Sequence, residues 1–225
     1  MEPVTYQALL NRFTHLNTTH ICDAMRQVRL LDPSIMPVIK NKKTIGRAVT
    51  VDSRGDSLSI IKALQISTPD SVLVIDSCAS THALIGEIFA IAALHKRIQG
   101  VILDGFYRDI NEIKAIGLPI YAKGTCARAG TKNKIGSIQE KITCGGVVVL
   151  PDEIIMADDD GIIVLSEREA VAVLPLAEQI KSREQIAVEK IRSGNALEDI
   201  YNFDEHYERI LTGDMDSTFS LSFSD

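Results

Sequence analysis

The feature that most constrains the fold is an apolar helical pattern that leads, within a few residues, into a short apolar run. The helical pattern covers residues 88–94 and is entered through Gly86-Glu87, and the short run is Val101-Ile102-Leu103. A run this short is too short for a buried helix, so it predicts a buried strand. Ligands of α/β folds bind where strands end and helices begin. The polar residues that follow the strand, and so form the candidate site, are Asp104, Gly105, Arg108 and Asp109.

The same alternation continues along the chain. Apolar, β-branched runs predict strands at residues 45–51, 72–76, 117–124, 145–150 and 162–165. Apolar residues at helical spacing predict helices at residues 6–13, 21–25, 57–66, 113–116 and 167–192. Interleaved strands and helices indicate an α/β fold. Residues 77–82 form a loop of the kind that closes over a ligand, and residues 125–136 predict a mobile loop or crossover.

Length and composition limit the class of protein. At 225 residues the chain suits one domain with a substantial core, which we place at residues 1–200. Residues 201–225 form a C-terminal extension whose Ser-rich tail is expected to be poorly ordered. The net charge of −6 argues against a general nucleic-acid surface, which needs a basic stripe.

The four cysteines and the N-terminal segment indicate the compartment. The cysteines are widely scattered and form no C-x-x-C pair, and the chain begins without a signal-peptide pattern. They are therefore expected to be reduced thiols in a cytoplasmic protein. No apolar run reaches the length needed to span a membrane, so no membrane partner is expected.

The acidic features allow more than one interpretation. Arg108 beside Asp109 offers a planar fork for a carboxylate or oxyanion and a hard oxygen ligand for Mg²⁺. The alternative is a surface ion pair that caps the following helix. Asp23 is either a pocket residue or a solvated or helix-capping carboxylate. The acidic run 158–160 is interpreted as a turn, because it lacks the alternating ligands and closing Glu of an EF-hand.

Glu87 is followed, after twenty intervening positions, by Arg108-Asp109. Around this spacing lie the segments VLVID, GVILDGFYRD and GGVVVLPDEIIMADDDGIIVLS. Over residues 18–194 the chain resembles the RraA-like family. That family includes the class II 4-hydroxy-4-methyl-2-oxoglutarate/4-carboxy-4-hydroxy-2-oxoadipate aldolases and the regulators of ribonuclease E activity. The resemblance implies a layered α/β/β/α swivelling fold that assembles as a homotrimer or, as a dimer of trimers, a homohexamer.

The resemblance also implies a reaction and residue roles. The family aldolases are metal-dependent lyases that cleave a 4-hydroxy-2-oxo acid, or decarboxylate oxaloacetate, through the enolate of pyruvate. Asp109 would hold Mg²⁺ or Mn²⁺, and Arg108 would contact the 2-oxo oxygen and stabilise the enolate. Glu87 would position or deprotonate a water on the metal, and Glu184 would reach the active site of a neighbouring subunit. The pyruvyl carboxylate would be bound by the backbone amides of Leu84, Ile85, Gly86, Glu87 and Ile88.

Position 87 also bears on the choice between functions. The aldolases usually carry Asp there, and the longer Glu87 favours decarboxylation over aldol cleavage. The ribonuclease regulators bind a protein partner without chemistry and typically lack this acidic residue, so Glu87 favours an enzyme. A methyltransferase is not supported, because no glycine-rich nucleotide loop follows the first strand. The expected partners are a 2-oxo acid and further copies of the chain.

Overall fold

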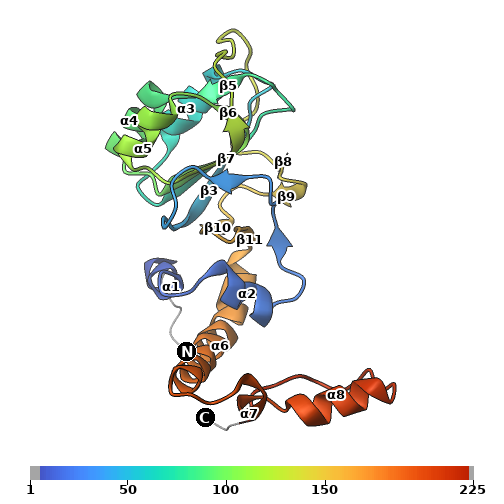
Figure 1. Ribbon diagram of the computed structural model, residues 1–225. Coiled ribbons are helices and arrows are strands. Elements are labelled where there is room, and N and C mark those ends of the chain that lie inside the picture. The colour runs from blue at the N-terminus through green and yellow to red at the C-terminus, as the bar shows by residue number, and fades with distance from the viewer. Residues whose placement is uncertain (1–5, 223–225) are drawn as a thin grey trace. The chain divides into compact units, whose positions relative to one another are not determined.

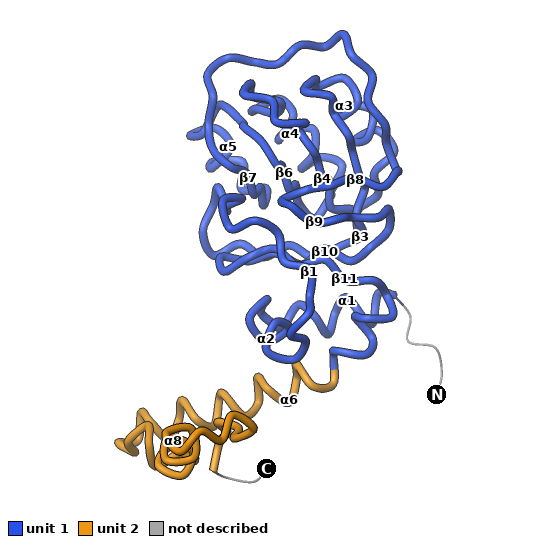
Figure 2. The backbone as a smooth tube through the Cα atoms, turned by 90° about the vertical axis from the view of Figure 1, so that its right-hand side faces the viewer, with its two compact units in different colours: residues 1–174 blue, residues 175–225 orange. Residues whose placement is uncertain are grey.

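The computed structural model describes residues 6–222. The chain divides into two compact units, Met1–Leu174 and Pro175–Asp225, which are coloured separately in Figure 2. The division falls inside the long helix α6 (Glu167–Arg192), next to the proline of that helix. The predicted domain boundary at residue 200 stays a prediction.

Unit 1 is built around a mixed sheet. Its strands are β1 (Arg29–Leu30), β2 (Met36–Pro37), β3 (Thr44–Asp52), β4 (Ser71–Asp76), β5 (Ala83–Ile85), β6 (Gly100–Tyr107), β7 (Ile120–Thr125), β10 (Ile154–Ala157) and β11 (Ile162–Leu165). They follow the order β1-β11-β10-β3-β4-β6-β7-β2, and β5 pairs with β6. β3, β4, β6 and β7 run parallel to one another, whereas β1, β2, β10 and β11 pair antiparallel with their neighbours.

Three helices cover one face of this sheet (Figure 1). They are α3 (Leu58–Ile66), α4 (Glu87–His95) and α5 (Ile110–Ile116). Ile60 of α3 and Ala90 of α4 are fully buried in one core with Leu73, Ile75 and Leu103 of the strands. The remaining helices of unit 1 are α1 (Tyr6–Phe13), α2 (Thr18–Ala24) and the start of α6.

A hairpin of β8 (Ile142–Cys144) and β9 (Val147–Val149) packs in a second core with residues from the sheet. Val72 and Val74 of β4 belong to this core, while Leu73 and Ile75 belong to the core under the helices. Alternate residues of β4 thus enter two different cores, which explains why the sequence here is apolar without a break. The predicted α/β fold is confirmed.

The parallel strands bring polar residues together at their carboxyl ends. Asp52 of β3 pairs in register with Asp76 of β4, and Asp76 pairs with Asp104 of β6. Loops that follow these strands therefore lie at one edge of the sheet, where α/β folds bind ligands. The second pocket described below is built from loops at this edge, and the candidate site combines the turn after β6 with β5, α3 and α4.

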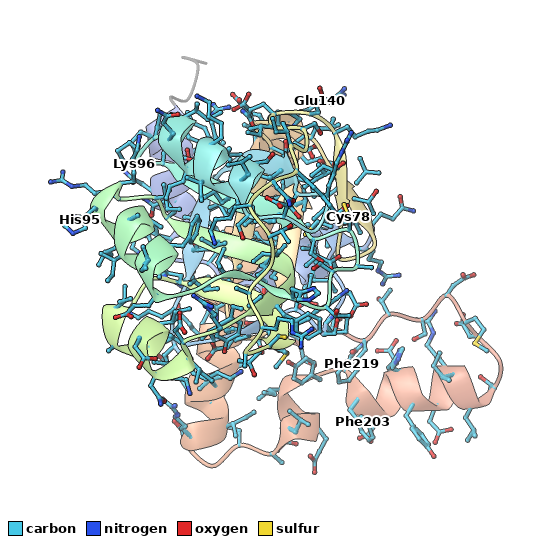
Figure 3. The ribbon with its side chains drawn as sticks, turned by 90° about the horizontal axis from the view of Figure 1, so that it is seen from above. Cys78, His95, Lys96, Glu140, Phe203 and Phe219 are labelled. Atoms are coloured by element: carbon cyan, nitrogen blue, oxygen red, sulfur yellow. The ribbon has the colours of Figure 1, made fainter. Side chains whose placement is uncertain are left out.

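Unit 2 consists of the rest of α6, α7 (Leu197–Ile200) and α8 (Phe203–Leu211). The described part of the Ser-rich tail contacts the residues that precede α8, and its expected poor order stays a prediction. The ring of Phe219 stacks on that of Tyr201 with centroids 4.6 Å apart, and Asn202 exchanges hydrogen bonds with Thr218 and Ser220. Phe219 and Phe203 are labelled in Figure 3. Residues 223–225 of the tail lie outside the described residues.

Within residues 6–222, none of the helices combines the length and the apolar character that crossing a membrane requires.

Candidate active site

Strand β6 ends later than the sequence predicts. It extends to Tyr107, so Asp104 and Gly105 lie inside the strand and only Arg108 and Asp109 follow it. β4 pairs with β6 as far as Asp104, and β5 and β7 pair with its last residues, which allows the strand to continue through polar residues. Asp104 forms an ion pair with Lys123 and accepts a hydrogen bond from the Gly145 amide at 2.7 Å. Its carboxylate is therefore engaged within the fold, and the site begins at Arg108.

Asp109 connects β6 to two helices. Its backbone is left-handed, with φ 62° and ψ 50°, at the residue that precedes α5. Asp is among the few residues other than glycine that tolerate this conformation. The side chain reaches the start of α4, where Oδ2 accepts a hydrogen bond from the Glu87 amide at 3.0 Å. A carboxylate at this position also interacts favourably with the dipole of α4.

Gly86 leaves the space that Asp109 occupies. A Cβ at this position would overlap Asp109 Oδ2 and lie 3.1 Å from Arg108 Cγ. The backbone of Arg108 is fixed as well, because its amide donates to the Ile85 carbonyl at 3.2 Å. The end of β5, the start of α4 and the turn after β6 therefore form one interlocked structure.

The Arg108–Asp109 ion pair is loose. Arg108 Nε lies 3.5 Å from Asp109 Oδ2, and the side chains are 44% and 35% exposed. Exposed pairs of this kind contribute little to stability. Within the described part of the chain, Asp109 is the one ion-pair partner of Arg108. The terminal guanidinium nitrogens thus remain available to a ligand.

A pocket of about 280 Å³ lies beside this pair. Ile61 and Leu64 of α3 and Ile88 and Phe89 of α4 supply apolar walls. Its polar side chains are those of Ser57, Arg108, Asp109 and Lys132. Apolar walls with a few convergent polar groups are typical of sites that bind small molecules.

The loop that carries Lys132 is held by a buried carboxylate. Asp56 is fully buried and accepts hydrogen bonds from Thr131 Oγ1 at 2.6 Å, the Asn133 amide at 2.8 Å and the Lys134 amide at 3.2 Å. Burial alone would raise the pKa of Asp56, but these bonds and one from Leu58 outweigh it and lower the pKa. The segment predicted as a mobile loop or crossover is thus fixed at its centre.

Residues 18–164 match the family model of RraA-like proteins, described as Aldolase/RraA. The chain belongs to the RraA-like family. This match ends before α6, whereas the resemblance seen in the sequence extends to residue 194.

Individual relatives of this RraA-like chain carry different names. A Halalkalibacterium halodurans protein named "Putative 4-hydroxy-4-methyl-2-oxoglutarate aldolase" is 34% identical over 84% of this chain and 90% of its own length. An uncharacterized protein from Pseudomonas syringae has a TM-score of 0.75 and 25% identity, covering 88% of this chain and 98% of its own. The RNA-processing inhibitor RraA of Thermus thermophilus has a TM-score of 0.63 and 26% identity, covering 67% and 93%.

The structure gathers most of the predicted site residues around one pocket. Leu84, Ile85, Gly86, Ile88, Arg108 and Asp109 all line it. Glu87 lies next to the pocket but is not among its lining residues, and its amide is bound by Asp109. Glu184 lies in unit 2 with an exposed side chain, and its role stays a prediction. Asp23 is exposed in α2 and does not line this pocket.

Asp158 has a structural role in this RraA-like fold. It accepts hydrogen bonds from the amide and hydroxyl of Thr18 at 2.7 and 2.6 Å, which fixes the start of α2. The acidic run 158–160 is the turn between β10 and β11, as the sequence predicts.

The donor groups of the pocket fit one kind of metal site. Among residues 6–222 there is no group of three or more His, Cys, Asp or Glu side chains suited to a metal ion. Mg²⁺, however, is usually held by one or two carboxylates and keeps several waters. The half-exposed carboxylate of Asp109 fits such a hydrated Mg²⁺ or Mn²⁺ ion.

Proposed function

We propose that this RraA-like protein is a divalent-metal-dependent lyase that acts on a small 2-oxo acid. It would cleave a 4-hydroxy-2-oxo acid by a retro-aldol reaction, decarboxylate oxaloacetate, or both. The observation that carries the proposal is the position of Arg108 and Asp109 together on the wall of one small pocket. The names of the aldolase-like relatives agree with a lyase.

The substrate carboxylate would bind between α4 and the loop that carries Lys132. The first amides of a helix have no partner within the helix, and Gly86 has no side chain to cap them. Asp109 takes the Glu87 amide, so the amides of Ile88 and Phe89 remain for a carboxylate. The ammonium group of Lys132 adds a positive charge at the same pocket.

Arg108 would stabilise the charge that develops during bond cleavage. In the retro-aldol reaction the C3–C4 bond breaks, its electron pair moves to the 2-oxo oxygen, and the 4-hydroxyl proton passes to a base. Returning a proton to C3 gives pyruvate and a second carbonyl product. In decarboxylation the bond to the C4 carboxylate breaks and CO₂ leaves. In both reactions the guanidinium faces the oxygen that becomes negative.

Glu87 is the proposed base, and it would act through a water molecule because its side chain does not line the pocket. Mg²⁺ or Mn²⁺ bound by Asp109 would supply Lewis-acid stabilisation of the substrate oxygens.

Self-association is part of the proposal. Leu58 and Ile61 of α3, Ile88 of α4 and Ile135 are exposed large apolar side chains, and Ile88 is 82% exposed. Ile61 and Ile88 line the candidate pocket, and Ile61 also lines an adjacent groove with Leu58 and Ile135. Apolar surface of this extent favours an interface, and we propose a homotrimer or homohexamer.

A coupled assay for pyruvate release tests the proposal. Oxaloacetate and a series of 4-hydroxy-2-oxo acids would be supplied with and without Mg²⁺. EDTA should abolish pyruvate release, and added Mg²⁺ or Mn²⁺ should restore it. Release that survives thorough chelation would exclude the metal mechanism. No release from any of these acids would favour a protein-binding regulator, the function that the structural likeness to RraA supports.

A further inference from the structure

A second pocket, of about 300 Å³, lies at the carboxyl ends of β3 and β4. It is lined by Arg54, Gly55, Cys78, Ser80, His82, Ala129, Gly130, Thr131 and Lys134. Ala129 is the one lining residue that it shares with the candidate active site. Figure 3 shows Cys78 on the opposite side of unit 1 from His95, which ends α4.

The charge of this pocket is one-sided. Arg54 and Lys134 are cationic, His82 is a third group that can carry a positive charge, and none of the lining side chains is acidic. In the described part of the chain, these three side chains have no ion-pair partner. Lys123, by contrast, is paired with Asp104 at the same edge of the sheet. Cations that line one pocket without an ion-pair partner attract an anion, although the carboxylate of Asp52 adjoins the pocket at Cys78.

The backbone that presents Arg54 is fixed in an uncommon conformation. Arg54 and Gly55 are both left-handed, with φ of 48° and 71°. The turn is held by two hydrogen bonds, from the Arg54 amide to Asp52 Oδ1 at 3.0 Å and from the Gly55 amide to Ser53 Oγ at 3.2 Å. Non-glycine residues held in such a conformation cluster at ligand-binding sites.

Cys78 makes the pocket suited to binding and not to nucleophilic chemistry. Its backbone is left-handed, with φ 52°, and its thiol donates to Asp52 Oδ1 at 3.0 Å. Partial desolvation of the thiol and its bond to Asp52 raise the pKa of Cys78 to about 11. At neutral pH the group is therefore a neutral thiol and not the reactive thiolate.

We propose that this pocket binds a small oxyanion through Arg54 and Lys134, with His82 as a third contact. The oxyanion is a phosphate group or a carboxylate. It is either a free anion or the second acidic group of a substrate whose 2-oxo acid end lies in the first pocket. The second case rests on the proposed function, and the shared wall at Ala129 supports it.

Calorimetric titration with inorganic phosphate and with malonate tests binding directly. The test variant is the double substitution Arg54→Gln/Lys134→Gln. The control is Lys114→Gln/Lys141→Gln, which removes two exposed charges that lie outside both pockets and outside the groove along α3. We expect saturable binding to the wild type and the control, and affinity at least about tenfold lower in the test variant. Equal affinity in all three proteins, or no saturable binding to the wild type, would overturn the proposal.

Kinetics then distinguish the two sources of the anion. If the anion is part of the substrate, the double substitution should raise KM for a 4-hydroxy-2-oxo acid that carries a second carboxylate. KM for a 4-hydroxy-2-oxo acid that lacks a second carboxylate should be unchanged. If KM is unchanged for both kinds of substrate while phosphate binding is lost, the ligand is a free anion. Melting temperatures of the three proteins show whether the fold is intact. The titration does not depend on lyase activity. The anion-binding proposal can therefore be tested even if the lyase proposal is wrong.

Discussion

Asp109 shows, at the scale of single residues, how one carboxylate can serve both the fold and the proposed reaction. Its Oδ2 binds the Glu87 amide at the start of α4, and its backbone forms the left-handed turn before α5. The two interpretations of the Arg108-Asp109 pair are thus not exclusive. Asp109 does cap a helix with its side chain, but that helix is α4, which precedes it in the chain, and not α5.

Two substitutions of Asp109 separate these roles. Asp109→Asn keeps an oxygen acceptor and tolerates the left-handed turn, so the melting temperature should stay close to that of the wild type while pyruvate release is lost. Asp109→Ala also removes the cap, which typically costs about 1 kcal/mol, and should melt at a lower temperature. The control is Asp23→Asn, the same change at an exposed carboxylate. Full activity in Asp109→Asn would rule out its proposed role as the metal ligand.

Arg108→Lys tests the planar donor. Lysine keeps the charge but cannot present two parallel N–H groups, so the change is not conservative at this position. Loss of one preorganised donor typically costs about 10²–10³ in kcat. The melting temperature should change little, because Arg108 is 44% exposed and lies outside the core. Arg97→Lys, at another exposed arginine, is the control. Equal rates in Arg108→Lys and wild type would contradict the enzyme.

At the scale of elements, the loop after β7 is organised by Asp56. Ionised Asp56 accepts bonds that fix residues 131–134, and its lowered pKa means that folding favours the ionised form. This stability is present above the pKa of an unfolded aspartate, about 3.9, and is lost as the pH falls through the lower pKa of the folded state.

Asp56→Asn should release this loop. An amide nitrogen cannot accept a hydrogen bond, and each bond lost to a charged group costs about 1.5–3 kcal/mol, or at least about tenfold in loop opening. Trypsin should therefore cleave after Lys132 or Lys134 at least about tenfold faster than in the wild type or in Asp23→Asn. The acid-dependent loss of stability below about pH 3.9 should also become smaller. Unchanged cleavage would show that other contacts hold the loop.

The sequence predicts the elements whose pattern is local. The apolar run identifies β4, because both faces of this strand are buried. The helical spacing of apolar residues identifies α3 and α6, because one face of each helix is buried. The strands β1, β2, β5, β8 and β10 were not predicted. Each has two to four residues and is defined by its partner and not by its own pattern.

The candidate site was also predicted only in part, because only some of its residues carry a local sequence signal. Arg108 and Asp109 were expected from their position after the apolar run of β6, and Gly86 from the family resemblance. All three line the same pocket. No local sequence pattern marks Lys132 as a site residue. Its loop is held at the pocket by the hydrogen bonds of Asp56 to the neighbouring residues. The hydrogen bond between Asp109 and the Glu87 amide likewise depends on a left-handed turn that the sequence does not specify.

At the scale of the whole molecule, the exposed apolar surface of unit 1 predicts assembly. Wild-type protein should behave as a trimer or hexamer in light scattering at micromolar concentration. Ile88→Asp places a charge on the most exposed of these side chains in α4 and should shift the protein toward the monomer, whereas Ile88→Leu should not. A monomeric wild type would contradict the proposed assembly and leave Glu184 without a neighbouring site to serve.

The loop held by Asp56 has a consequence for the order in which the chain folds. Its bonds to Thr131, Asn133 and Lys134 join residues 75, 77 and 78 positions apart. Contacts between such distant residues carry a large closure entropy and form slowly compared with local ones. Because this loop lines both pockets, we expect the two pockets to form late, after the sheet that supports them. A chain interrupted before that closure would contain most of its core and neither pocket.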